Sequence, residues 1–187
     1  MKRCGVLIIV FTGGEPLLRE DLGIIIAHIY NKEISISIAT NGILLPQTLS
    51  WLREKVDTLT ISLDGPEEVH NELRGKQTYE KAITALELAV KNRMNVILAT
   101  VLTKINTNLD CIRHILDIAE RFNIKVFFQP VANFPNKSNN PLFPSITQYR
   151  QVLDYLINRK KKDGRAGAVG NSLSALYYLF RWPARIE

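Results

Sequence analysis

The sequence predicts an α/β fold: a partial (β/α)6-type barrel with about five parallel strands, its first strand missing. Strand-like and helical segments alternate along the chain, an order typical of a parallel sheet with right-handed crossovers. Several strands pair an apolar face with a face of Ser and Thr. A doubly wound sheet would favour Val and Ile on both faces, so the polar face indicates an open barrel whose lumen holds a polar ligand.

The strands are expected from continuous or alternating apolar runs. Residues 5–11 form a continuous β-branched run, typical of a buried parallel strand. Residues 34–39 and 56–63 alternate strictly, and residues 96–102 and 126–131 are further apolar runs. The small polar residues assigned to the second face are Ser35, Ser37, Thr58, Thr60, Ser62 and Thr100.

The helices are expected where apolar residues recur at helical spacing. Ser145 and Gln148 form a capping box at the start of a long one. A loop rich in Asn and Pro is expected before it, and a Gly-rich break after it. The expected helices lie at residues 17–30, 47–54, 79–92, 109–119, 145–162 and 172–180. We assign residues 1–144 to the barrel core and residues 145–187 to a C-terminal helical segment.

Composition narrows the class of protein. Net charge is +6, but the densest basic run, residues 159–162, precedes Asp163-Gly164 at an expected helix end, where cations favour the helix dipole. We therefore expect neither a nucleic-acid nor a membrane partner. The two cysteines, Cys4 and Cys111, form no short-spaced motif, which fits a reducing compartment, and we expect a cytoplasmic protein.

Three glycine-marked polar turns follow three expected strands. They lie at residues 13–16 (GGEP), 40–42 (TNG) and 62–65 (SLDG). Ligands of parallel α/β folds bind at the carboxyl ends of the strands. These turns should therefore converge on one rim and form a binding site.

Five segments, in order, resemble the sequence landmarks of radical S-adenosylmethionine (SAM) enzymes, and most closely the branch with a SPASM or twitch extension. The likeness is strong over residues 5–131 and looser up to Trp182. The segments are residues 11–18 (FTGGEPLL), residues 40–42, residues 61–65 (ISLDG), His70 with Arg74-Gly75, and Asn106.

This resemblance implies a SAM-binding site on a TIM-like barrel. The turn of Gly13, Gly14, Glu15 and Pro16 would bind the amino group of SAM. Ser62 would hydrogen-bond the SAM carboxylate, and Arg74 would pair with it through a fork that matches two oxygens. Asn41 and Asp64 would shape the pocket or touch the ribose, and Asn106 matches a further polar position.

Plainer interpretations remain open for several of these residues. Gly13 and Gly14 could form only a tight turn, and Asp64 could cap the next segment. Asn41 could serve a left-handed backbone position, and Arg74 could make a surface ion pair of little energetic value. The histidines His28, His70 and His114 are expected to be structural rather than catalytic. A TIM-like phosphate-binding enzyme would need a Gly-rich turn after a late strand, and residues 131–134 offer none.

The family holds a catalytic [4Fe–4S] cluster through a C-x-x-x-C-x-x-C motif, which this sequence lacks. Cys4 lies before the strand that carries GGEP, and Cys111 lies within a helix. We expect a fragment, truncated at both ends, of an enzyme that in full-length form cleaves SAM reductively to act on a peptide or small molecule. By itself the chain is expected to be inactive and to hold no metal. The alternative is a non-catalytic SAM-binding or partner-binding module, and residues 5–11 would be an exposed apolar edge open to association.

Overall fold

The computed structural model describes residues 5–30, 34–131 and 140–181. Five strands form one sheet in the order β1-β2-β3-β4-β5, as the predicted α/β fold with five parallel strands requires. Registers such as Ile8 with Ser35 and Ser37 with Thr58 fix the first three strands side by side. The strands are β1 (Ile8–Phe11), β2 (Ser35–Thr40), β3 (Thr58–Ser62), β4 (Val96–Leu102) and β5 (Lys125–Pro130).

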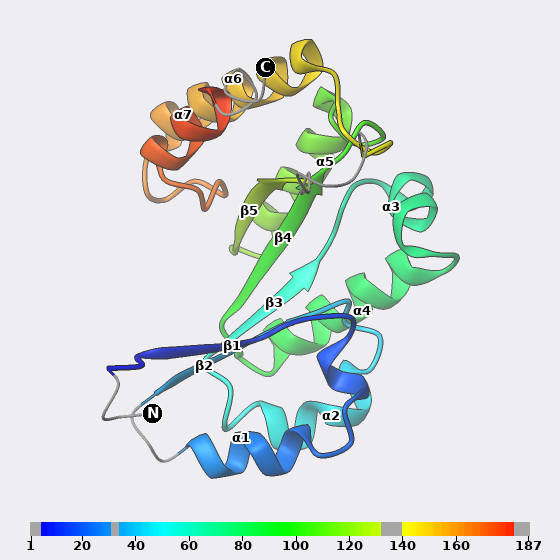
Figure 1. Ribbon diagram of the computed structural model, residues 1–187, viewed down its shortest axis with the longest axis vertical. Coiled ribbons are helices and arrows are strands. Elements are labelled where there is room, and N and C mark those ends of the chain that lie inside the picture. Colours follow the sequence, from blue (N-terminus) through cyan, green and yellow to red (C-terminus); the bar gives the residue numbers. More distant parts are fainter. Residues whose placement is uncertain (1–4, 31–33, 132–139, 182–187) are drawn as a thin grey trace. The chain divides into compact units, whose positions relative to one another are not determined.

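Helices alternate with these strands along the chain (Figure 1). They are a 3-10 turn, η2 (Pro16–Leu18), and the α-helices α1 (Leu22–Tyr30), α2 (Leu45–Leu52), α3 (Glu67–Arg74), α4 (Thr78–Lys91), α5 (Leu109–Arg121), α6 (Ile146–Asp163) and α7 (Leu173–Arg181). The chain divides into two compact units, one of residues 1–62 and 76–97 and one of residues 63–75 and 98–187. The domain boundary expected near residue 144 stays a prediction.

In the first unit, helices cover one face of the sheet and leave the other face open. Ile36, Ile38, Leu59 and Ile61 are fully buried on the covered face, where α1, α2 and α4 lie (Figure 1). The alternate residues of the same strands are only half-buried: Ser35, Ser37, Ala39, Thr58, Thr60 and Ser62. The small polar face predicted from the sequence is therefore the uncovered face here.

In the second unit, α5 lies against β5, and α6 and α7 lie side by side (Figure 1). Thr100 corrects a prediction, because it is fully buried and alternates in phase with Leu98 and Leu102. It therefore belongs to the apolar face of β4 rather than to the open polar face. Burial is tolerated because the Thr100 hydroxyl donates to the Leu63 carbonyl at 2.7 Å.

Two helical segments differ from the sequence prediction. The prediction of one continuous helix over residues 17–30 is wrong, because η2 ends at Leu18 and Arg19 is extended (φ −78°, ψ 114°) before α1 begins. The helix α3 was not expected at all. Its signals are nevertheless present, since Glu67 and Glu68 fill its first turn, Arg74 its last, and Gly75 follows with φ 108°.

The long helix α6 begins and ends as predicted. The Ser145 side chain accepts a hydrogen bond from the Gln148 backbone N–H, which caps the first turn. Gly164, at φ 63°, follows the last residue, and its N–H donates to the Lys160 carbonyl. The capping residues at its two ends therefore predict the bounds of α6 from the sequence alone.

Candidate functional site

The carboxylate of Glu15 joins the turn after β1 to the turn after β2. Its Oε1 accepts from the Thr40 hydroxyl at 2.6 Å and from the Leu17 N–H at 3.1 Å. Its Oε2 accepts from the Asn41 N–H at 2.8 Å. We call Glu15, Leu17, Thr40 and Asn41 the Glu15 clamp. Both carboxylate oxygens are engaged within the first unit, so Glu15 positions these turns through its own side chain.

The turn before Glu15 presents open backbone. Gly13 and Gly14 are exposed, and a Cβ added at either one would meet no atom within 4 Å. Gly13 has φ +130°, which side-chain-bearing residues rarely adopt. Pro16 begins η2 and fixes the exit from the turn. The peptide groups of this turn can therefore be approached closely by a ligand.

The turn after β2 places its glycine where a helix passes closely. The Asn41 side chain accepts from the Ile43 N–H at 2.9 Å, a local Asx turn. The left-handed residue is Gly42, at φ +83°, and a Cβ there would lie 2.7 Å from the Ala85 Cβ of α4. Asn41 is not among the positive-φ residues, so it does not serve a left-handed position. Ser62, the last residue of β3, is half-buried.

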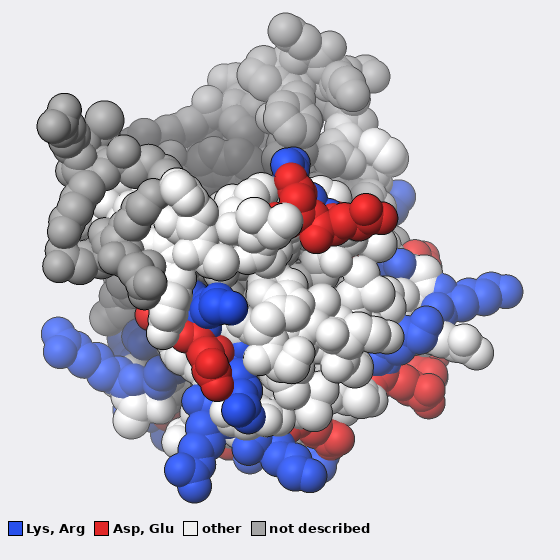
Figure 2. All heavy atoms as spheres, turned by 90° about the horizontal axis from the view of Figure 1, so that it is seen from below, with Lys and Arg blue, Asp and Glu red and all other residues white. Residues whose placement is uncertain are grey.

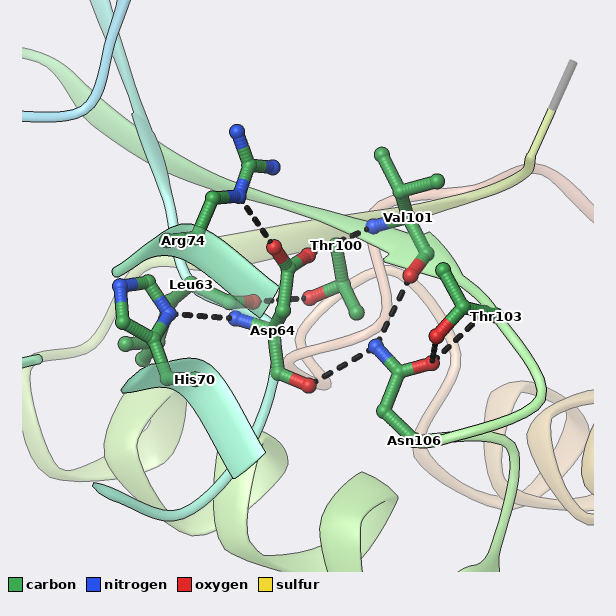
Figure 3. A network of polar contacts seen from close by, with 8 residues as sticks. All are labelled: Leu63, Asp64, His70, Arg74, Thr100, Val101, Thr103 and Asn106. Atoms are coloured by element: carbon green, nitrogen blue, oxygen red, sulfur yellow. Dashed lines mark hydrogen bonds and ion pairs between the residues drawn. The ribbon is translucent and has the colours of Figure 1, made fainter. Parts of the chain in front are cut away.

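The second unit has its own polar centre around Asp64, drawn in Figure 3. The Asp64 side chain is only 3% exposed. Its Oδ2 accepts from the Arg74 Nε at 2.6 Å, and its Oδ1 accepts from the Val101 N–H at 2.9 Å. A buried carboxylate needs such partners, because an unpaired buried charge is strongly destabilising. We call Asp64, His70, Arg74, Val101 and Asn106 the Asp64 network.

Arg74 uses only part of its hydrogen-bonding capacity in this network. Nε faces Asp64, while the two terminal nitrogens point away from that carboxylate (Figure 3). The side chain is 33% exposed, and these two nitrogens have no partner among the described residues. A guanidinium held in this way presents a planar pair of donors suited to an external carboxylate.

Asn106 lies inside the network and is fully buried. Its Nδ2 donates to the Asp64 and Val101 carbonyls, both at 2.8 Å. Its Oδ1 accepts from the Thr103 N–H at 2.7 Å and the Thr103 hydroxyl at 3.0 Å. The amide is thus saturated by internal contacts, and its influence on any ligand would pass through the position of Asp64.

His70 holds the other end of Asp64. Its Nδ1 accepts from the Asp64 backbone N–H at 3.2 Å, and the residue is 2% exposed. Burial lowers the pKa of His70; Asp64 opposes this effect and Arg74 adds to it. The sequence prediction gave His70 no chemical task, and it included Thr40 in the turn of residues 40–42 without assigning its side chain a role. Thr40 carried a signal, since it is a polar residue in phase with the buried Ile36 and Ile38.

Cys111 is a core residue of α5, the helix in which the sequence places it. It is 3% exposed near the start of α5, and burial raises the pKa of its thiol. A Cβ added to Gly65 would lie 2.7 Å from Val69 Cγ1 and 3.6 Å from the Cys111 sulfur. Glycine is therefore required at position 65, and Cys111 has the environment of a packing residue. Cys4, which is expected to lie before the strand that carries GGEP, is outside the described residues.

The basic run at the end of α6 is engaged in internal contacts. Arg159 pairs with Glu120 and Asp163. The Lys160 ammonium donates to the Val169 carbonyl at 2.7 Å, and the Lys161 ammonium lies 5.6 Å from the Tyr177 ring centroid. Figure 2 draws one face of the molecule, seen from below, and on that face acidic side chains lie among basic ones. These contacts support the structural interpretation of the run, and the expected lack of a nucleic-acid partner stays a prediction.

Comparison with known families identifies the chain. Residues 1–119, more than half of the sequence, match the family described as the radical SAM superfamily. The chain belongs to the radical SAM superfamily. This confirms the family resemblance and gives SAM as the family's cofactor. The SPASM or twitch branch stays a prediction.

Radical SAM relatives of several activities resemble the chain. A GTP 3′,8-cyclase of Sulfurovum sp. is 37% identical over 131 residues, which cover 66% of this chain and 39% of the relative. An Fe-coproporphyrin III synthase of Methanosarcina barkeri is 29% identical over 164 residues, which cover 84% and 40%. The chain thus spans less than half the length of these relatives.

Solved structures show the same fold. The structure described as anSMEcpe with bound AdoMet superposes with a TM-score of 0.70 at 22% identity, covering 87% of this chain and 48% of that one. SuiB of Streptococcus suis, bound to the precursor peptide SuiA, gives a TM-score of 0.74 at 18% identity, covering 94% and 41%. The fold prediction of a partial radical SAM barrel is therefore confirmed at the level of the strands and helices.

The residues present do not fit a [4Fe–4S] cluster. The sequence has two cysteines, and the described part of the chain contains no cluster of three or more His, Cys, Asp or Glu side chains able to hold a metal. No described helix combines the length and hydropathy needed to cross a membrane.

Among the described residues, the polar groups best suited to a ligand are the open Gly13-Gly14 turn and the terminal nitrogens of Arg74, each in its own unit. Their convergence on one rim stays a prediction.

Proposed function

We propose that this chain binds the methionine end of SAM as the SAM-holding part of a radical SAM enzyme. The observation that supports this most directly is the Arg74 side chain. Asp64 fixes its Nε, and its two terminal nitrogens remain available at a half-buried position. Such a fork matches the two oxygens of an amino-acid carboxylate.

The first unit, taken by itself, offers groups suited to an ammonium such as that of SAM. The exposed Gly13-Gly14 turn allows close approach of backbone carbonyls to an ammonium group. Glu15 would act there as a positioning residue, because its oxygens already hold Thr40 and Asn41. The half-buried Ser62, at the end of β3 in the same unit, carries a hydroxyl that could also hydrogen-bond a ligand.

In the radical SAM superfamily, an electron from a [4Fe–4S] cluster cleaves SAM to a 5′-deoxyadenosyl radical, and the cofactors supply this chemistry. The residues of this chain do not fit the cluster, so we expect the chain by itself to bind SAM without cleaving it. Two relatives are named for GTP and for a coproporphyrin, and the similar structure of SuiB has a precursor peptide bound. This diversity favours no single substrate, and our proposal is confined to SAM.

Calorimetry with SAM tests the proposal. We expect Arg74→Leu to weaken binding by about 10- to 100-fold, the loss typical of a hydrogen-bonded charge. Arg113→Leu is the matched control, because Arg113 lies on α5 with a 54% exposed side chain and one long ion pair. Equal affinities in the wild type and Arg74→Leu would contradict the assignment.

A second candidate function is a partner-binding module. Leu7, Ile8 and Val10 are 75%, 60% and 57% exposed on or beside the edge strand β1. Exposed apolar residues on a strand edge favour association with another chain. This function does not exclude SAM binding, because the Gly13-Gly14 turn lies beyond the strand.

A further inference from the structure

Two side chains on one face of α3 form hydrogen bonds with Asp64. His70 and Arg74 are four residues apart, so both project from the same side of the helix. The Nδ1 of His70 accepts a hydrogen bond from the backbone N–H of Asp64, and the Nε of Arg74 donates one to the Asp64 carboxylate (Figure 3). The orientation of Arg74 therefore depends on Asp64, and that of Asp64 depends in part on His70.

The contact with Asp64 fixes the protonation state of His70. An imidazole nitrogen that accepts a hydrogen bond carries a lone pair, so the Nδ1 of His70 is unprotonated. Protonation at Nδ1 would place an N–H donor against the N–H of Asp64 and end the contact. It would also place a second cation near Arg74.

The groups around His70 work against each other. The charge of Asp64 stabilises the imidazolium, and the charge of Arg74 disfavours it. Burial is the largest influence and favours the neutral ring. Because the folded-state pKa lies below the ordinary 6.5, the folded form takes up this proton only at a pH lower than an unperturbed histidine needs. The neutral contact is therefore present near neutral pH and is lost as the pH falls through that pKa.

We propose that His70 is a positioning residue, which keeps the Asp64–Arg74 pair in its ligand-binding arrangement only while its Nδ1 is unprotonated. This inference rests on the proposed function in naming SAM as the ligand. The Asp64 carbonyl and Oδ1 remain held by Asn106 and Val101. Loss of the His70 contact would thus release the α3 side of Asp64 without unfolding the network.

The test follows the free protein by NMR from pH 8 downward until the His70 ring nitrogens have passed through their midpoint. The backbone N–H of Asp64 and the Nε–H of Arg74 should shift with the same midpoint as the His70 ring nitrogens. In His70→Asn, whose side-chain oxygen can replace Nδ1 as an acceptor and does not titrate, both signals should lose that midpoint. In His114→Asn, the control, they should keep it, because His114 lies on α5 outside the Asp64 network although burial also lowers its pKa.

Calorimetry with SAM over the same pH range adds the functional readout. Below the His70 pKa, wild-type affinity should fall by up to about tenfold per pH unit more than that of His70→Asn. The pH profile of His70→Asn serves as the baseline, because it contains every titration other than that of His70, including that of SAM itself. His70→Leu, which lacks an acceptor, should bind SAM weakly at every pH.

The outcomes separate the two proposals. The role of His70 is overturned if the Asp64 and Arg74 signals do not shift at the His70 midpoint, or if they still do so in His70→Asn. This conclusion holds whether or not SAM binds. Parallel pH profiles of SAM affinity in the wild type and His70→Asn overturn the role of His70 as well. If SAM fails to bind at pH 8 while the NMR signals follow His70, the proposed function fails and the coupling of His70 to Asp64 and Arg74 stands.

Discussion

Two carboxylates, Glu15 and Asp64, organise the ends of neighbouring strands at the scale of single residues. Where a strand stops, backbone N–H groups lose their ladder partners and need other acceptors. Glu15 accepts from the N–H groups of Leu17 and Asn41, and Asp64 accepts from that of Val101. Hydrogen bonds to an ionised acceptor are stronger than neutral ones, so one acidic residue can fix a whole turn.

Replacing Glu15 by Gln should destabilise the protein by about 1–3 kcal/mol. The amide group can still accept through its oxygen, but its NH2 would oppose the Asn41 or Leu17 N–H. Urea unfolding would measure the difference, with Glu20→Gln as the control, because Glu20 is exposed in the same loop. Equal losses in the two variants would show that the clamp contributes nothing to stability.

At the scale of elements, residues 168–171 extend the sheet beyond β5. Val169 forms a parallel bridge with Val126, whose N–H donates to the Ala168 carbonyl. The Asn171 side chain then continues the ladder: its Oδ1 accepts from the Phe128 N–H at 2.8 Å, and its Nδ2 donates to the Phe128 carbonyl at 2.9 Å. A side-chain amide thus substitutes for one residue of an additional strand.

Removing this amide should therefore loosen the β5 edge. We expect Asn171→Leu to cost about 2–6 kcal/mol, because it leaves the buried N–H and carbonyl of Phe128 without partners. Thermal or urea unfolding would record the loss, and hydrogen exchange should locate it at Phe128. Asn158→Leu is the control, since Asn158 is exposed on α6. A variant as stable as this control would exclude the strand-like role of Asn171.

At the scale of the whole molecule, the sheet has an exposed apolar edge at β1. Ile8 and Val10 pair in register with Ser35 and Ser37 and so lie on the open face. Their exposures of 60% and 57% leave apolar surface where another strand or chain can bind.

Self-association through this edge should depend on protein concentration. We expect size-exclusion chromatography with light scattering to show oligomers that Val10→Lys shifts toward monomer, because an edge lysine opposes strand pairing. Ile24→Lys should leave the oligomers unchanged, since Ile24 is equally apolar and 74% exposed but lies on α1. A wild-type protein that stays monomeric at every concentration would contradict this prediction.

Periodicity and capping residues in the sequence predicted most of the elements, because these signals act over a few residues. Strict alternation located β2 and β3, and Ser145 with Gly164 bounded α6. The same local rules failed at Arg19, where the chain leaves η2, and at α3, whose short amphipathic run was overlooked. The prediction for Thr100 gave the wrong face, because its polarity suggests exposure, whereas the carbonyl of Leu63, just beyond β3, satisfies its hydroxyl.

The sequence by itself determined the order of the strands and of most helices, the family resemblance, and the residue types at each turn. Only the tertiary structure decided what those residues do. It showed that internal hydrogen bonds saturate Asn106 and engage both carboxylate oxygens of Glu15. It also showed that the two terminal nitrogens of Arg74 have no partner in the described part of the chain. The reason is physical: whether a polar group can reach a ligand depends on which partners already satisfy it. Several of those partners, such as Thr40 for Glu15 and Val101 for Asp64, are distant in sequence and meet only when the strands pair.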